Sequence, residues 1–279
     1  MKHNLLVIAT LSILVLPALG KPRIVRPDLP LAAIKSIVWV AAHPDDDVLV
    51  APILASLCLD RDVECTLMVL TRGEKGNCHL EGECPSDVGM VRSAEMGSAS
   101  QYFGANLVLL KYSDGGGKPD GSAPAWDLEA GGHQRLVTSL SFLLQSFQAD
   151  VILTFDPRHG TTCHLDHMAT GKLVREASVE AGILAKLYYL ESRLHVTTPI
   201  RFQFSPAFAG PGLKSFNANV PLISNGQPSW SALVNTMRIH RSQFNELWVA
   251  AALDVPASER VIFFAGATEA ERSPNLNCR

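Results

Sequence analysis

Residues 36–47 read Ser-Ile-Val-Trp-Val-Ala-Ala-His-Pro-Asp-Asp-Asp, an apolar run that ends in a cluster of polar side chains. A continuous apolar run of this length, with β-branched residues in it, is typical of a strand buried on both faces of a parallel sheet. A second run, 151–155, has the same character and is soon followed by His164-Leu165-Asp166-His167. Each cluster therefore follows the carboxyl end of a predicted strand, which is where open α/β sheets bind ligands.

Strand-like and helix-like segments alternate through the first two thirds of the chain. The expected strands cover 36–42, 63–71, 107–110, 151–155 and 187–190, and the expected helices cover about 47–59, 85–103, 134–147 and 165–181. This alternation predicts an α/β fold of one domain: a Rossmann-like, doubly wound, mostly parallel sheet with helices on both faces.

Two parts of the chain interrupt this regular pattern. Segment 114–125 is rich in Gly, Pro and Asp and is expected to be a loop. Region 197–229 contains several prolines and is expected to be irregular, with one edge strand near 202–208. A helix over about 230–250 and a short final strand over 260–264 should complete the fold.

The N-terminal segment has the pattern of a secretory signal peptide. Lys2 and His3 precede an apolar run over 5–16, and the small residues Ala18 and Gly20 stand where a signal peptidase would cleave. The apolar run is shorter than the roughly 20 residues that a membrane-spanning helix needs, so no stable membrane insertion is expected. We therefore expect removal of residues 1–20 and a secreted or periplasmic domain over residues 21–279.

Export would place the six cysteines in an oxidising compartment, where they can form disulfides. Cys78 and Cys84 flank a short polar segment and are the easiest pair to close. Cys58 and Cys65 could pair or could simply be buried, and the remaining two cysteines stay unassigned because six allow fifteen pairings.

Composition bears on the partner class. Hydrophobic residues make up 47% of the 279 residues, and the formal net charge is −3. A nearly neutral chain has no general electrostatic attraction for nucleic acid. Nucleic acid is therefore not an expected partner, and a small-molecule or glycan substrate is.

The two polar clusters should meet in the folded chain. In a doubly wound sheet with strand order 3-2-1-4-5, the first and fourth strands are neighbours, and the crevice outside their ends is the switch point. His43 and Asp46 stand three residues apart on a turn that Pro44 stiffens, and His167 could supply a third ligand. Three N and O ligands with an open position for water are typical of a catalytic zinc site.

The remaining polar residues of the clusters suggest catalytic roles. Asp45 lies between two expected ligands and could deprotonate a water molecule. His164 could act as a general acid or polarise a carbonyl, and Asp166 could fix the tautomer of an imidazole. The alternative is that these residues only cap helices and form turns; two such clusters at neighbouring strand ends make that alternative weaker.

The motifs resemble those of the PIG-L/LmbE-like zinc-dependent de-N-acetylases. Ala42-His43-Pro44-Asp45-Asp46-Asp47 is similar to that family's Ala-His-Pro-Asp-Asp-Glu motif, and His164-Leu165-Asp166-His167 is similar to its His-Pro-Asp-His motif. Further matches occur in the family's order along nearly all of the mature chain: Thr71-Arg72-Gly73-Glu74-Lys75-Gly76, Arg92-Ser93-Ala94-Glu95, Asp114 and His240-Arg241-Ser242-Gln243.

The resemblance implies a role for each matching residue. One zinc ion per chain, with Fe²⁺ as the alternative metal, would be held by His43, Asp46 and His167, with Asp45 as the general base. His164 would stabilise the oxyanion or protonate the leaving amine.

The resemblance also implies that Arg92 and Asp114 contact the sugar or other polar groups of the substrate. A surface charge and a turn residue are the alternatives for these two. Glu74 and Glu95 are expected to be structural, and His240, in a late helix, could be merely a surface histidine.

Three departures from the family motifs bear on the site. Asp47 replaces the usual Glu, which should weaken a hydrogen bond behind the metal ligands. Thr162 stands where some members have a catalytic tyrosine, and Leu165 replaces the usual Pro. Metal binding should survive these changes, whereas catalytic detail and substrate preference depend on them.

The resemblance and the residues together predict an exported metal-dependent hydrolase that removes an acetyl group from an N-acetylated amino sugar or glycoconjugate. The alternatives are a metal-dependent amidase for another acylated amine or thiol conjugate, and a non-catalytic carbohydrate-binding protein with the same fold. The intact Asp45 argues against the last one, because a protein that only binds needs no base.

Overall fold

The computed structural model describes residues 33–80, 82, 84–115, 121–197, 200–207, 212–270 and 278. Its centre is a seven-stranded sheet with the order β3-β2-β1-β4-β5-β9-β8. The strands are β1 (Ser36–Ala41), β2 (Glu64–Thr71), β3 (Asn106–Tyr112), β4 (Val151–Phe155), β5 (Leu187–Leu190), β8 (Lys214–Asn217) and β9 (Val261–Gly266). The expected signal peptide, residues 1–20, lies outside the described residues.

The predicted order 3-2-1-4-5 is confirmed. Strands β3, β2, β1, β4 and β5 are all parallel, and Trp39 of β1 pairs with Leu67 on one side and Leu153 on the other. Strands β9 and β8 continue the sheet in antiparallel fashion. The central strands β1 and β4 are almost entirely buried, as their continuous apolar sequences predict.

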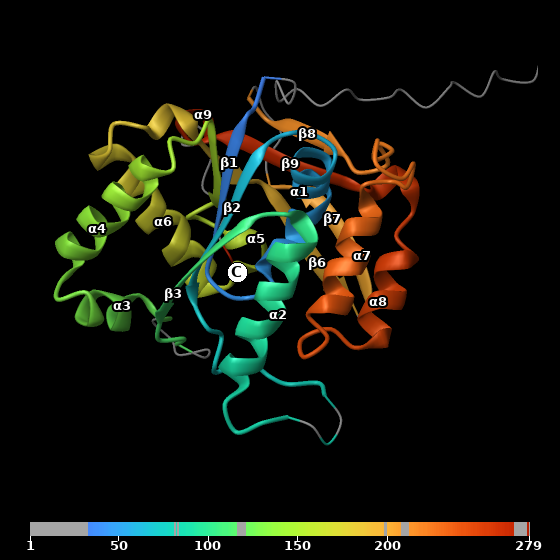
Figure 1. Cartoon of the computed structure of the whole chain (residues 1–279), viewed down its shortest axis with the longest axis horizontal. Coiled ribbons are helices and arrows are strands. Elements are labelled where there is room, and N and C mark those ends of the chain that lie inside the picture. The colour runs from blue at the N-terminus through green and yellow to red at the C-terminus, as the bar shows by residue number, and fades with distance from the viewer. Residues whose placement is uncertain are drawn as a thin grey trace, which may run out of the picture.

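Helices cover both faces of the sheet (Figure 1). One face packs against α1 (Ala51–Leu54), α2 (Val88–Phe103), α7 (Trp230–Ile239) and α8 (Glu246–Leu253), and the other against α3 (Ala123–Glu129), α4 (His133–Ser146) and α6 (Leu165–Glu180). Alternate residues of β1 point to opposite faces of the sheet. Trp39 packs in the apolar core on the first face, and Val38 and Val40 pack in the apolar core on the second face. Two short helices, α5 (Gly160–Cys163) and α9 (Ala267–Ala270), complete the set.

Several expected elements differ in detail. The predicted helix over 47–59 is a chain of three short pieces, a 3₁₀ turn at Asp46–Leu49, α1, and a π turn at Ala55–Leu59. The predicted helix over 230–250 is two helices, because a turn follows His240 and the Asn245 side chain accepts the N–H groups of Leu247 and Trp248 to begin α8. The expected loop over 114–125 gives way to α3 at Ala123.

The region after β5 contains a hairpin, of which the sequence predicts one strand and not the other. Strands β6 (Ser192–Thr197) and β7 (Arg201–Pro206) pair antiparallel as a separate two-stranded sheet. The edge strand expected near 202–208 corresponds to β7, but its partner β6 was not expected. The hairpin contacts α8 and lies close to α5, so it stands beside the carboxyl edge of the sheet.

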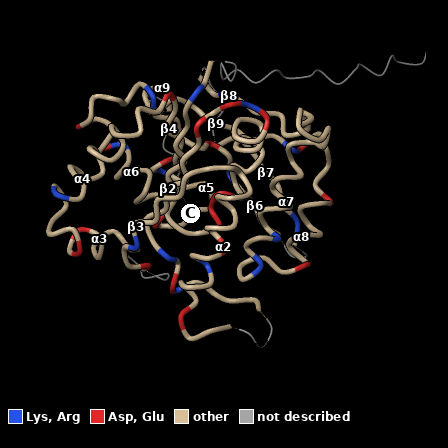
Figure 2. The backbone as a smooth tube through the Cα atoms, viewed as in Figure 1, with Lys and Arg blue, Asp and Glu red and all other residues tan. Residues whose placement is uncertain are grey.

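Three disulfides are present among the described residues. The predicted Cys78–Cys84 pair is confirmed, Cys58 and Cys65 also pair, and Cys163 pairs with Cys278. Within the described residues, no helix is long and apolar enough to cross a membrane. Acidic and basic residues are scattered along the trace in Figure 2, and no long stretch of a single sign is visible in that view.

Candidate metal and catalytic site

The turn after β1 is closed by the Asp46 side chain. Its Oδ2 accepts hydrogen bonds from the backbone N–H groups of Ala42 (3.0 Å) and His43 (2.8 Å). Asp45 has a φ of 116°, a backbone conformation that costs free energy for a residue with a Cβ atom. The turn therefore holds the His43, Asp45 and Asp46 side chains in fixed directions at the switch point.

His167 joins the first cluster to the second. It lies in the first turn of α6, and its ring stacks on Phe155 at 4.0 Å between centroids. Its Nδ1 lies 2.9 Å from the carbonyl oxygen of Gly160, which can only accept a hydrogen bond, so Nδ1 carries a proton. Its Nε2 lies 2.9 Å from Asp46 Oδ1.

The His167–Asp46 contact needs a proton or a cation between Nε2 and the carboxylate oxygen. In a neutral imidazole protonated at Nδ1, the lone pair of Nε2 would face a carboxylate oxygen, which repels it. Either a second proton on the ring or a cation between the two atoms removes the repulsion. An imidazole nitrogen and a carboxylate oxygen are ordinary zinc ligands, so the donor atoms present here fit a metal ion.

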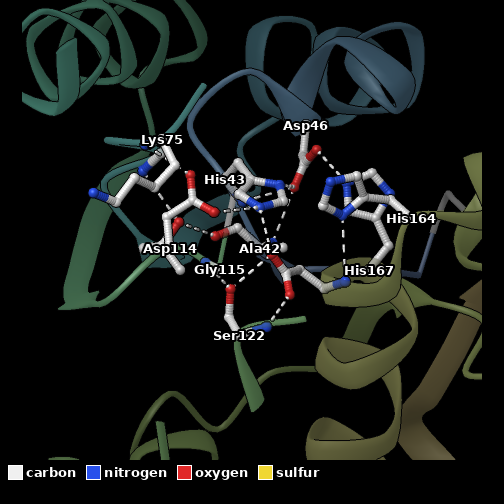
Figure 3. A network of polar contacts seen from close by, with 12 residues as sticks. Ala42, His43, Asp46, Lys75, Asp114, Gly115, Ser122, His164 and His167 are labelled. Atoms are coloured by element: carbon white, nitrogen blue, oxygen red, sulfur yellow. Dashed lines mark hydrogen bonds and ion pairs between the residues drawn. The ribbon is translucent and has the colours of Figure 1, made fainter. Parts of the chain in front are cut away.

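His43 approaches the same carboxylate from the other side (Figure 3). Its Nδ1 lies 3.7 Å from Asp46 Oδ2, and its Nε2 lies 3.2 Å from Asp166 Oδ2. Asp166 is itself fixed by Ser122, whose hydroxyl donates to it at 2.7 Å. The structure thus brings together the three expected ligands His43, Asp46 and His167, and gives Asp166 the contact expected of a residue that orients an imidazole.

The electrostatics of this group favour a cation. Burial alone would raise the pKa of Asp46, but His167 and His43 outweigh it and hold that pKa far below the usual range. Burial would also raise the pKa of Asp166, yet hydrogen bonds from His43 and Ser122 lower it to about 2. For His43, burial lowers the pKa, but Asp166, Asp46 and Asp45 outweigh it and raise the pKa. Both carboxylates are therefore ionised in a nearly closed site.

His164 lies against the other two imidazoles, with ring centroids 4.9 Å from His43 and 5.0 Å from His167. Its Nδ1 accepts a hydrogen bond from the backbone N–H of Asp166 at 3.3 Å. Burial, and then the neighbouring imidazoles, lower the pKa of His164 to about 4. A neutral ring that accepts at Nδ1 carries its proton on Nε2, so His164 can donate one hydrogen bond there.

Asp45 is held by Arg92, which extends from α2. Nη2 of Arg92 lies 2.9 Å from Asp45 Oδ1 and donates to the Pro44 carbonyl at 2.6 Å, while Nη1 donates to the Gly73 carbonyl at 2.9 Å. Gly73 has a φ of 63°, and a Cβ atom there would stand 2.3 Å from Arg92 Nη1. Burial, the largest influence, raises the pKa of Asp45 against the opposing charge of Arg92. The resemblance implies that Arg92 contacts the substrate; the contacts that Arg92 makes in the structure position Asp45, and substrate contact stays a prediction.

Asp114 stands on the opposite wall. Its Oδ2 accepts the backbone N–H of Lys75 at 3.1 Å, and its own N–H donates to Glu74 at 2.9 Å. Its Oδ1 lies 3.8 Å from His43 Nε2. Asp114 therefore lies at the edge of the ligand cluster, and Glu74 has the structural role that the sequence predicts.

Two cavities open onto the cluster. A polar cavity of about 460 Å³ is lined by residues that include His43, Lys75, Arg92, Asp114, His164 and Gln243. An apolar cavity of about 210 Å³ lies beside it, and the two share Asp45, Asp46 and His167. Ligands can therefore reach the expected metal ligands from two sides of different chemistry.

Comparison with known protein families decides the membership of this chain. The family described as PIG-L, GlcNAc-PI de-N-acetylase, matches residues 38–178, which run from β1 to α6 and contain both clusters. This chain belongs to the PIG-L family.

Two curated relatives of this PIG-L chain are similar over different lengths. A 1D-myo-inositol 2-acetamido-2-deoxy-alpha-D-glucopyranoside deacetylase from Thermobifida fusca is 26% identical over 165 residues, which is 53% of this chain and 56% of that protein. A deacetylase with the same name from Nocardiopsis dassonvillei is 25% identical over 245 residues, 74% of this chain and 83% of that protein. The chain thus spans little more than half of the first relative.

Solved structures share the fold at low identity. The N,N'-diacetylchitobiose deacetylase of Pyrococcus horikoshii has a TM-score of 0.57 at 18% identity, with 89% of this chain and 90% of that chain covered. A 4-carboxy-2-hydroxymuconate hydratase from Pseudomonas putida has a TM-score of 0.51 at 17% identity, with 83% and 95% covered. A fold that carries both a deacetylase and a hydratase does not fix the reaction.

The structure corrects the expectation for His240 in this PIG-L chain. His240 is not a surface histidine: it is fully buried, and its Nε2 lies 2.8 Å from Asp47 Oδ1. Asp47 therefore does find a partner despite being one methylene shorter than Glu. Glu95, expected to be structural, accepts from the N–H of Ser242 at 2.9 Å and from its hydroxyl. These contacts attach the turn between α7 and α8 to the turn after β1 and to α2.

One contact of the site was missed by sequence reasoning. Ser122 holds Asp166, but it follows a Gly-rich segment that signals only a loop, and its spacing relative to the two clusters carries no signal. Thr162, which stands where some family members have a tyrosine, lies 3.1 Å from His167 Nδ1 and lines the apolar cavity.

A second group of potential ligand atoms lies after β4. Asp156, His159 and Glu191 are all fully buried and close enough together to hold a metal ion. Arg158, however, occupies the position of a cation: its Nε donates to Asp156 at 3.0 Å, and its Nη2 lies 3.3 Å from Glu191. This group is therefore already charge-compensated within the protein.

Proposed function

We propose that this chain is an exported, metal-dependent hydrolase that removes the acetyl group from an N-acetylated amino sugar or glycoconjugate of the N-acetylglucosamine type. One observation carries the proposal: Asp46 is shared by His43 and His167, at distances that suit a cation, beside the partly buried Asp45. Membership of the PIG-L family supports the same reaction class.

The residues that would hold the metal are His43, Asp46 and His167, one ion per chain. The donor set of two imidazoles and one carboxylate suits zinc, and Fe²⁺ is the alternative. The metal, when bound, supplies Lewis acidity toward the amide carbonyl and toward water. Asp166, fixed by Ser122, would keep the His43 ring in one orientation.

The chain's own residues would handle the protons. Asp45, with a pKa raised by burial and an orientation set by Arg92, would accept a proton from the attacking water. The water oxygen would bond to the carbonyl carbon, the C–N bond would break, and the proton accepted by Asp45 would pass to the leaving nitrogen, which gives acetate and an amine. His164, neutral and protonated at Nε2, would donate a hydrogen bond to the oxygen that gains negative charge. Of its two expected roles, this favours oxyanion stabilisation.

The polar cavity would hold the sugar. Asp114 offers a carboxylate to hydroxyl groups, and Lys75, Arg92 and Gln243 add donors around the same space. The relatives from Thermobifida fusca and Nocardiopsis dassonvillei are named for an acetamido sugar linked to inositol, which supports a glycan or glycoside as substrate here.

Export is supported by the cysteines. The described residues contain three disulfides and no free cysteine, a usage typical of oxidising compartments. The N-terminal pattern over residues 1–20 supports the same route.

Acetate release from a substrate panel tests the function. Purified protein supplied with zinc would be incubated with N-acetylglucosamine, N,N'-diacetylchitobiose, an N-acetylglucosamine–inositol conjugate and a simple N-acetylated amine without hydroxyls. We expect equal amounts of acetate and free amine from at least one sugar, and much less from the simple amine. Release only from a non-sugar amide would make the chain another amidase, and binding of sugar without release would make it a carbohydrate-binding protein.

A further inference from the structure

The apolar cavity beside the cluster is built largely by a part of the chain outside the family match. Leu194 and Val196 of β6, Phe202 and Phe204 of β7, and Met237 of α7 line it together with Trp248 of α8. These residues follow residue 178, where the match to the family ends, whereas Val48, Leu49 and Thr162 add to the lining from within the match. Most of the apolar wall therefore comes from the hairpin, α7 and α8.

The walls of this cavity are packed against one another. Leu194 pairs with Phe204 and Val196 with Phe202 across the hairpin, and Phe202 stands 5.5 Å from Trp248 between ring centroids. The opposite wall is made by buried residues of α7, such as Leu233 and Met237. A space of about 210 Å³ between such walls favours an apolar occupant.

The position of the cavity determines which part of a substrate can occupy it. Asp45, Asp46 and His167 line both this cavity and the polar one. A carbonyl carbon placed at these residues therefore has its two substituents directed toward two different spaces. The polar cavity, with Asp114 and Lys75, suits the sugar that carries the nitrogen. The apolar cavity is left for the substituent on the other side of the carbonyl.

From this arrangement we infer that, among N-acylated amino sugars, the chain prefers those whose acyl chain is longer than acetyl, and that the apolar cavity holds that chain. The inference rests on the proposed function and specifies its substrate class. An apolar aglycone is a weaker candidate, because it is attached to the sugar and would begin beyond the polar cavity, away from Asp45, Asp46 and His167.

The reaction is the same hydrolysis with a different carboxylate product. The water oxygen bonds to the acyl carbon, the C–N bond breaks, the nitrogen gains a proton, and a medium-chain carboxylate leaves. Each methylene that moves from water into the cavity should increase kcat/KM about fourfold. We therefore expect a gain of about 15-fold from N-acetyl to N-butyryl glucosamine and about 250-fold to N-hexanoyl glucosamine.

The test measures amine release from N-acetyl, N-butyryl and N-hexanoyl glucosamine with the zinc-supplied protein. Val196→Asp places a carboxylate at the cavity wall, at a residue that is 44% exposed and tolerates a polar side chain. This variant should lose the gain along the series, so that the three substrates are cleaved within about a fewfold of each other. His195→Asp, on the opposite face of the same strand, adds the same charge and should keep the gain.

The outcomes separate the inference from the proposed function. Release of amine from none of the three substrates would overturn the proposed function. Release from N-acetylglucosamine at an equal or higher kcat/KM than from the longer substrates would leave that function standing and overturn the acyl-chain assignment. The assignment would also be overturned if octyl N-acetylglucosaminide were preferred over the methyl glycoside and Val196→Asp removed that preference, because the cavity would then hold an aglycone. Melting temperatures of both variants within a few degrees of wild type establish that they are folded.

Discussion

Among the described residues, the buried histidines and carboxylates at the switch point can be compared with a second such group after β4 and β5, and the two differ in how their charges are compensated. The first contains His43, Asp46 and His167, and the second contains Asp156, His159 and Glu191. Both follow strands at the centre of the sheet, and both bring nitrogen and oxygen atoms together. The second group has its ligand atoms within 4.8 Å of one another, so close spacing alone does not identify a metal site.

Charge compensation distinguishes them. In the second group, His159 Nδ1 accepts the N–H of Thr161 at 3.0 Å, so its Nε2 carries a proton that can be donated to Glu191 at 3.2 Å. Arg158 supplies the positive charge for Asp156. In the first group, Nε2 of His167 instead faces Asp46 and opens onto two cavities. A candidate metal site is thus better recognised by a lone pair that faces a carboxylate than by distances.

The largest expected effect comes from His43→Ala. Removal of one of three ligands should reduce bound zinc from about one ion per chain to almost none. Deacetylation should then fall by about a thousandfold or more, because a bound metal lowers the activation free energy by several kcal/mol. Metal analysis of the purified variants measures this. His159→Gln is the matched control and should retain the metal; metal loss in the control alone would reverse the assignment of the two groups.

Asp45→Asn should separate catalysis from metal binding at the first group. The amide keeps the shape of the side chain but cannot accept a proton, so kcat should fall by about 10²–10⁴ while zinc content stays near one per chain. Steady-state kinetics and metal analysis on the same preparation measure the two effects. Turnover near the wild-type rate would show that Asp45 is not the base.

Arg158→Met tests whether the second group is structural. The variant leaves Asp156 buried without its positive partner, which should lower the free energy of unfolding by about 3–5 kcal/mol. Zinc content should stay unchanged. Denaturant unfolding measures the loss, and uptake of a second zinc ion by the variant would show that Arg158 had been standing in for a metal.

The sheet order and the meeting of the two clusters could be predicted from sequence because both depend on local signals. Continuous apolar runs mark β1 and β4 as central parallel strands, and the strand count places their ends together. The His-Pro-Asp-Asp and His-Leu-Asp-His motifs then fix most of the candidate site. The Cys78–Cys84 disulfide was predictable for the same reason, because a short segment separates the two residues.

Contacts between distant segments could not be predicted in this way. His240 and Asp47 are 193 residues apart, and no periodicity in the chain indicates that they meet. Strand β6 was missed because its partner β7 alone carried a strand signal, although the two form one hairpin. The role of Arg158 was also hidden, because a single arginine after a strand has the pattern of a surface charge. Tertiary packing determined all three.

Asp114→Ala should have a moderate effect that concerns the substrate and not the metal. The loss of a carboxylate that pairs with sugar hydroxyls costs about 1–3 kcal/mol, which lowers kcat/KM by roughly ten- to a hundredfold. The zinc content should be unchanged, and a simple N-acetylated amine without hydroxyls should be much less affected than a sugar. Equal losses on both substrates would show that Asp114 acts only through its contacts with Lys75 and Glu74.

The smallest expected effect concerns the pH dependence of stability, through the second group. Burial, together with Asp156, raises the pKa of Glu191 from 4.5 to about 9, and burial lowers the pKa of His159 from 6.5 to about 4. Between pH 4.5 and 9 the folded state therefore keeps a proton on Glu191 that the unfolded chain has released, so stability falls as pH rises. Below pH 6.5 the unfolded chain binds a proton on His159 that the folded state does not bind. This contribution makes stability rise with pH, so it offsets the contribution of Glu191 in that range.

The contribution of Glu191 should therefore be visible mainly between pH 7 and about 9. Glu191→Gln keeps a neutral hydrogen-bonding group and removes the titration, so its melting temperature should rise relative to wild type as the pH rises through this range. Thermal unfolding at several pH values measures the difference, and Glu259→Gln at an exposed position is the control that should show no such trend. A constant difference between Glu191→Gln and wild type across the range would mean that Glu191 is already ionised at pH 7. With Asp156 and Glu191 both ionised, Arg158 alone would not balance their two negative charges, and a further cation would be needed. The second group would then no longer differ in charge compensation from the candidate metal site.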